Sequence, residues 1–75
     1  MNEDAFNLEI RRFLKRFGIT AQREIEKAVE AAINSGALKG QEVLPVRATL
    51  TMPGLLPPVQ IDGEIALAGQ APMSP

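Results

Sequence analysis

The spacing of the apolar residues changes once along this chain. Between Phe6 and Ile33 they recur every three or four residues, and between Val46 and Leu67 they alternate with other residues. The first spacing is typical of amphipathic helices, and the second is typical of strands with one buried face. Helices followed by a short antiparallel sheet predict an α+β fold in which the helices cover one face of the sheet.

The first helical segment has a clear beginning and a clear end. Asn2 is a favourable N-cap, and Gly18 can adopt the left-handed conformation that ends a helix. At 100° per residue, the large apolar side chains between them fall within an arc about 100° wide. They are Phe6, Ile10, Phe13, Leu14 and Phe17. We expect the three aromatic rings to form core, because a small domain needs its largest apolar side chains for burial.

A second helical segment follows the link Ile19-Thr20. Thr20 is a suitable N-cap, and Ser35-Gly36 ends the repeat. The apolar positions of this segment are Ile25, Ala28, Val29, Ala32 and Ile33. The sequence therefore predicts two N-terminal amphipathic helices packed on one face of a C-terminal antiparallel β-hairpin, in the order α-α-β-β.

The alternating half predicts two strands. The first spans residues 46–52 and leads into Pro53-Gly54, which suits a type II turn. The second spans residues 59–67 and contains Asp62-Gly63, a pair that also favours a two-residue hairpin turn. A turn there would mix polar and apolar side chains on each face. We favour a continuous strand, with or without a bulge at Gly63, because it keeps the large apolar side chains together.

The length of 75 residues predicts a single domain. We place this small α+β domain at residues 1–67. Residues 68–75 show no periodicity and predict a disordered tail. Ala37 to Pro45 contains Gly40 and reads as a connector between the helices and the strands.

The composition argues against enzyme chemistry. The chain has no cysteine and no histidine, which removes the common thiolate ligands, the usual neutral-pH base and the commonest metal ligand. Asp62 and Glu64 are two residues apart without a third ligand nearby. We therefore expect no catalytic residue, no metal, no cofactor and no small-molecule ligand.

The acidic start at Glu3-Asp4 is not followed by a long apolar run. It predicts neither a signal peptide nor a membrane span, and we therefore expect a cytoplasmic protein.

Four cations gather on the first helical segment, opposite its apolar side chains. They span an arc of about 140° at 100° per residue and include Arg11, Arg12, Lys15 and Arg16. Such a cluster could contact nucleic-acid phosphates. A solvated helix face is the favoured interpretation, because the overall net charge is −1 and no aromatic residue lies among the cations. Leu8 points among them and is a candidate partner contact.

The predicted hairpin leaves apolar and edge surface open. Leu55-Leu56-Pro57-Pro58 carries no charge, so its two leucines either fold back to cap the small core or contact a partner, and both interpretations stay open. A sheet of two strands also has two open edges. We therefore expect a small non-enzymatic interaction module that uses a sheet edge or the Leu55-Leu56 loop. Its partner would be a second copy in a homodimer or another protein, and a weak nucleic-acid binder is the alternative function.

Most of residues 1–67 resemble a small bacterial family known only as a domain of unknown function. The resemblance is carried by Met1-Asn2-Glu3-Asp4, Arg12-Phe13-Leu14-Lys15, Gly18-Ile19-Thr20, Gln22-Arg23-Glu24-Ile25-Glu26-Lys27-Ala28, Ser35-Gly36-Ala37-Leu38-Lys39-Gly40 and Ile61-Asp62-Gly63-Glu64-Ile65. It implies a stand-alone cytoplasmic bacterial protein. It implies no activity and no site residues.

Overall fold

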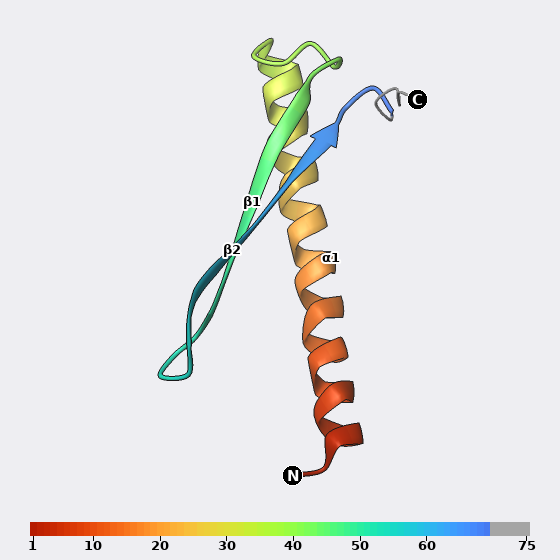
Figure 1. Ribbon diagram of the computed structural model, residues 1–75. Coiled ribbons are helices and arrows are strands. Elements are labelled where there is room, and N and C mark those ends of the chain that lie inside the picture. The colour runs from red at the N-terminus through yellow and green to blue at the C-terminus, as the bar shows by residue number, and fades with distance from the viewer. Residues whose placement is uncertain (70–75) are drawn as a thin grey trace, which may run out of the picture. The chain divides into compact units, whose positions relative to one another are not determined.

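The computed structural model describes residues 1–69 and shows one helix followed by one β-hairpin (Figure 1). The helix α1 spans Glu3–Ser35, and the strands β1 and β2 span Val43–Met52 and Leu56–Ala66. By its contacts the chain divides into two compact units, of which the first is Met1–Ala37 and the second begins at Leu38. The α+β class is as expected.

The prediction of two helices is wrong, because α1 continues for 33 residues without a break. Gly18 does not adopt the positive φ that ends a helix, and it lies inside α1 together with Thr20. A glycine inside a helix costs only about 1 kcal/mol relative to alanine, less than is lost when several intrahelical hydrogen bonds are given up. Ala21 also joins the two apolar segments, since it lies four residues after Phe17 and four before Ile25.

Both outer ends of α1 are capped as predicted. The Asn2 side chain accepts a hydrogen bond from the backbone N–H of Ala5 at 3.0 Å, which satisfies one free donor of the first turn. Gly36 has a φ of 86°, and its N–H donates to the carbonyl of Ile33 at 3.1 Å. This left-handed glycine ends the helix because it has no Cβ to clash in that conformation.

The hairpin turns where the sequence predicts. The N–H of Leu55 donates to the carbonyl of Met52 at 3.0 Å, and Gly54 has a φ of 76°. Proline at the second position of the turn and a positive φ at the third are typical of a type II turn. The strands are longer than expected, since β1 begins at Val43 rather than Val46 and β2 at Leu56 rather than Val59. Part of the predicted connector is therefore strand.

Strand β2 runs through Asp62-Gly63 without a turn, which settles the two alternatives in favour of a continuous strand. Gly63 lies opposite Val46 in an uninterrupted stretch of the register, so the strand has no bulge there. The irregularity lies nearer the turn, where the pair Pro57-Pro58 faces the single residue Thr51. Prolines suit this position because they cannot donate to the ladder and are tolerated at bulges.

The register sorts the hairpin side chains by polarity. Residues directly opposite each other share a face. The apolar hairpin face consists of Leu44, Val46, Ala48, Leu50, Met52, Leu56, Val59, Ile61 and Ile65, with Gly63 opposite Val46. On the other face the Nε of Arg47 donates to Oδ1 of Asp62 at 2.6 Å. Thr49 opposite Gln60 continues that polar face.

No side chain within residues 1–69 is buried. The three aromatic rings of α1, predicted as core, are about half exposed: Phe6 at 49%, Phe13 at 50% and Phe17 at 46%. One helix, or one two-stranded sheet, cannot cover its own apolar face, so neither unit contains a core of its own. Most of the predicted tail, residues 70–75, lies outside the described residues.

Candidate interaction surface

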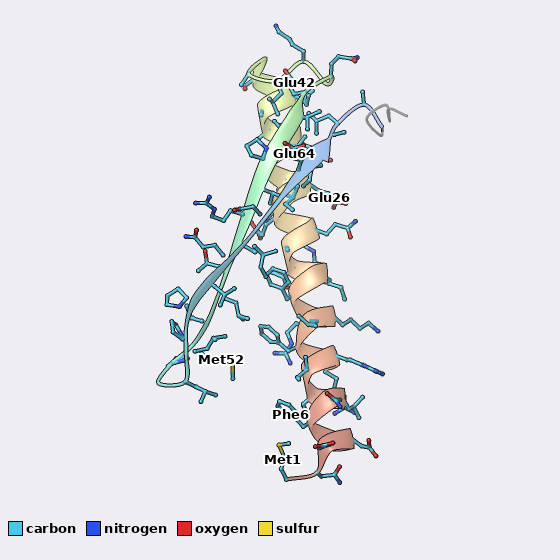
Figure 2. The ribbon with its side chains drawn as sticks, in the orientation of Figure 1. Met1, Phe6, Glu26, Glu42, Met52 and Glu64 are labelled. Atoms are coloured by element: carbon cyan, nitrogen blue, oxygen red, sulfur yellow. The ribbon has the colours of Figure 1, made fainter. Side chains whose placement is uncertain are left out.

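The apolar hairpin face is a continuous surface without a charged group. It follows from the alternation of side chains along β1 and β2 and from a register that pairs apolar residues with one another. Ile61 is 58% exposed, and Met52 and Val59 are also exposed. Figure 2 shows Met52 near the turn of the hairpin. Gly63 leaves a notch in this face, where an added Cβ would lie 3.6 Å from Cγ1 of Val46.

The two leucines that the sequence placed together in a loop have different positions. Leu55 belongs to the turn and is 76% exposed. Leu56 begins β2, lies opposite Met52 and is half-buried. The expected loop is therefore shorter than predicted, because Leu56 and the prolines that follow it are strand residues. A shallow open depression lined by Gly54, Leu55, Leu56 and Pro57 lies at this end of the hairpin.

The four clustered cations lie on exposed positions of α1. The Nη1 of Arg12 pairs with Oε2 of Glu9 at 3.2 Å, so one of the four is partly neutralised within its own helix. Among residues 1–69, Arg11, Lys15 and Arg16 take part in no ion pair. The structure thus leaves three cations available to a partner.

Leu8 is 47% exposed beside these cations, as the helical spacing predicts. Sequence reasoning missed a second exposed apolar residue on the same side, Ile19. It was assigned to a link between helices. In a continuous helix it follows Leu8 by eleven residues, which is about three turns. This eleven-residue spacing from Leu8 is the sequence signal that could have revealed Ile19.

The connector between the two elements contains a polar cluster that the sequence did not reveal. The Glu42 carboxylate accepts hydrogen bonds from the backbone N–H groups of Lys39, Gly40 and Gln41, at 2.9–3.2 Å. These bonds, that of Lys39 first, lower the pKa of Glu42 from its ordinary value, because they stabilise the ionised form. The backbone carbonyl of Glu42 also accepts from Leu67 at 2.9 Å. Glu42 therefore holds the loop before β1 and the residue after β2.

Within residues 1–69, no three potential metal-binding side chains come together, and α1 is not apolar enough to cross a bilayer. The Asp62 carboxylate, which the sequence raised as one half of a carboxylate pair, is engaged by Arg47. The described residues do expose large apolar side chains on both α1 and the hairpin.

The comparison with known families agrees with the resemblance in the sequence. The family of unknown function DUF6494 matches residues 1–68, nearly the whole described chain. The chain belongs to this family. The DUF6494 match covers α1 and both strands, so helix and hairpin are parts of one family unit. No curated protein and no solved structure matches the chain.

Proposed function

We propose that this DUF6494 protein is a small non-enzymatic protein-interaction module. Its contact surface is the apolar hairpin face, with Leu55 at the turn. The observation that carries the proposal is the register, because it gathers the apolar side chains of both strands on one face and leaves the ion pair of Arg47 and Asp62 on the other. Exposed apolar patches with a polar surround are typical of protein-binding surfaces.

The size of the exposed side chains supports this proposal. Burying apolar surface contributes about 25 cal/mol per Å². Leu55 and Ile61 are more than half exposed and carry no polar group, so a partner that covers them gains without removing water from a charge. The outer edges of β1 and β2 add unpaired backbone groups, which a strand from another protein or from a second copy could join.

We also propose a cytoplasmic location in a bacterial cell. The absence of cysteine suits a compartment in which stabilising disulfides do not form. The family resemblance points the same way.

The proposal is tested with two aspartate variants. Leu55→Asp places a charge in the turn, where the side chain makes little contact with the rest of the chain, so the hairpin should still form. Tagged wild type captures proteins from the native cell, and Leu55→Asp should lose the specific ones, because a buried carboxylate costs several kcal/mol at an apolar contact. Thr49→Asp on the polar face is the matched control and should keep them. Equal partner sets from all three proteins would contradict the proposal.

A second candidate function is nucleic-acid binding by the basic cluster of α1. It is favoured by one observation, that Arg11, Lys15 and Arg16 form no ion pair within residues 1–69. Cations of this kind neutralise phosphates and release counterions. The cluster is small, so the binding would be weak and dependent on salt.

A further inference from the structure

The continuity of α1 creates an apolar stripe that neither predicted helix had alone. The helix stripe is formed by Phe6, Ile10, Phe13, Phe17, Ala21, Ile25, Ala28 and Ala32, and its arc also contains Leu14 and Glu24, each five residues from position 19. Successive residues of the helix stripe are separated by four or three positions, and the order of these intervals is the same from either end of the stripe. The centre of this symmetry is position 19, which is also the midpoint of Glu3–Ser35. Figure 1 shows α1 as one unbroken helix along this whole length.

The positions of the helix stripe are symmetric about position 19, but the sizes of their side chains are not. Large side chains occupy the half before position 19, and alanines occupy most of the half after it. Phe6 and Ala32 are equally far from the centre, at thirteen residues each, and Phe17 and Ala21 are two residues away from it. Ile10 is likewise matched by Ala28, at nine residues each. Three of these large residues thus have an alanine at the mirror position, whereas Phe13 is matched by Ile25 and Leu14 by Glu24.

We propose that the helix stripe binds a second copy of itself, with the two helices antiparallel and related by a two-fold axis at position 19. Such an axis brings each residue opposite its mirror position in the other copy. Phe17 then faces Ala21, and Phe6 faces Ala32, so that each ring fills the space above an alanine. Alternating large and small side chains across a helix pair allow close packing of the two backbones.

The repeat length fits two nearly straight helices. Phe6, Phe17 and Ala28 are spaced by eleven residues. Eleven residues make three turns at 3.67 residues per turn, which is close to the value of a straight helix and favours a slight right-handed supercoil. The helix stripe therefore stays in contact along a helix of about 50 Å, at 1.5 Å per residue.

Charge favours the antiparallel direction. A parallel pair in register would set residues 11–16 of both copies at the same level, with four cations on the outer side of each helix. The antiparallel pair sets them beside residues 22–27, where two cations and two glutamates balance. Glu9 and Lys27 share one edge of the helix stripe, ten residues before and eight after the centre, so unlike charges of the two copies would lie close together. Within one copy, Glu9 pairs with Arg12 and Lys27 with Glu24. Figure 2 shows Phe6 and Glu26 on opposite sides of α1, which leaves Glu26 in solvent.

The surface available is sufficient for a dimer. A phenylalanine buries about 150–250 Å² when fully covered, and the three rings of α1 are about half exposed. Six half-exposed rings thus remove on the order of 600 Å² from water, and the aliphatic residues beside them bring the total to about the 1,200 Å² at which specific interfaces begin. This surface is formed by residues of α1, whereas the proposed function rests on residues of the hairpin, so different variants test the two proposals.

A size swap tests the mirror relation. Ala21→Phe should set ring against ring at the centre and weaken self-association about tenfold or more, and Phe17→Ala should weaken it by leaving a void. The double variant Phe17→Ala, Ala21→Phe exchanges the two sizes and should restore association, although its composition at the stripe equals that of the wild type. The measurement is the dimer dissociation constant from sedimentation equilibrium, with helix content by circular dichroism as the folding control. A double variant weaker than both single variants would overturn the proposal.

Engineered cysteines give the direction independently, since the chain contains none. Ile10→Cys and Ala28→Cys are oxidised separately and as an equal mixture. Mirror positions come within the 3.5–4.5 Å that separates Cβ atoms in a disulfide. The mixture should therefore form a disulfide-linked dimer, and each variant alone should not. Crosslinks within each single variant, a monomer at all concentrations, or attachment of these positions to the hairpin of the same chain would each overturn the proposal.

Discussion

At the scale of single residues, Glu42 is the side chain with the most local partners in the described structure. Its carboxylate accepts N–H groups from three consecutive residues, beginning with Lys39. In a loop without helix or sheet, those donors would otherwise require water. Because the acceptor is a charged group, the bonds are stronger than neutral ones and depend on ionisation. The loop before β1 is thus sensitive to acid.

The pH dependence of this loop has a definite sign. The pKa of Glu42 is lower in the folded protein than its ordinary value of 4.5. Its contribution to stability is therefore fully present above pH 4.5 and is lost as the pH falls through the lower, folded pKa. Glu42→Gln should lower the urea midpoint at neutral pH and flatten its decline below pH 4.5. The matched control, Glu64→Gln, changes an exposed carboxylate opposite Pro45 and should keep the wild-type decline. Identical pH profiles for Glu42→Gln and wild type would show that the N–H bonds contribute nothing.

At the scale of secondary structure, the continuity of α1 decides what the helix can bind. Gly18 has helical geometry, and nothing lies within 4 Å of the position that a Cβ would take there. No neighbouring atom therefore requires a glycine at position 18, and the only cost to the helix is the low helix propensity of this residue. Gly36 has the opposite role, because its φ of 86° requires the absence of a Cβ. The sequence predicts a helix end at both glycines, but in the structure Gly18 lies inside α1 and only Gly36 ends it.

Substitution of the two glycines should change stability in opposite directions. Gly18→Ala should stabilise the helix by about 1 kcal/mol, since alanine has the higher helix propensity and meets no neighbour. Gly36→Ala should destabilise it by about 1 kcal/mol, because alanine is strained at positive φ. Thermal unfolding followed by circular dichroism measures both. Destabilisation by Gly18→Ala would mean that the helix ends at Gly18 after all.

At the scale of the whole molecule, the described chain presents apolar surface in both of its compact units. The hairpin gathers apolar residues by strand register, and α1 gathers them by helical spacing. Neither unit buries a side chain completely. A chain of this kind gains stability mainly from what covers these faces, so association and folding should be coupled.

One titration of the full chain tests the alternative function, nucleic-acid binding by the basic cluster of α1. Neutralising the basic cluster with Arg11→Gln, Arg12→Gln, Lys15→Gln and Arg16→Gln should abolish weak binding of DNA or RNA and remove its dependence on salt, because the released counterions come from those contacts. Fluorescence anisotropy with a labelled oligonucleotide at low salt measures it. Arg23→Gln, Lys27→Gln on the later part of α1 is the control and should bind as the wild type does. An absence of binding by the wild type at low salt would discard this function.

Several local features of this chain were predictable from the order of its amino acids. The N-cap at Asn2, the left-handed stop at Gly36 and the type II turn at Pro53-Gly54 were all predictable, because each depends on the conformational preference of one or two residues. The continuous strand through Gly63 was also predictable, since a turn there would have mixed polar and apolar faces. The open edges of a two-stranded sheet followed from the same alternation.

Other features depend on the three-dimensional arrangement, because local conformational preference leaves their alternatives nearly balanced. Glycine at position 18 costs about 1 kcal/mol in a helix and is favourable at a helix end, so only the complete path of hydrogen bonds shows that α1 continues. The start of β1 at Val43 and of β2 at Leu56 depends on strand pairing, which spacing alone cannot reveal. The cluster around Glu42 requires a loop that bends three N–H groups toward one carboxylate. No sequence pattern indicates such a loop, so only the structure shows that these N–H groups and the carboxylate come together.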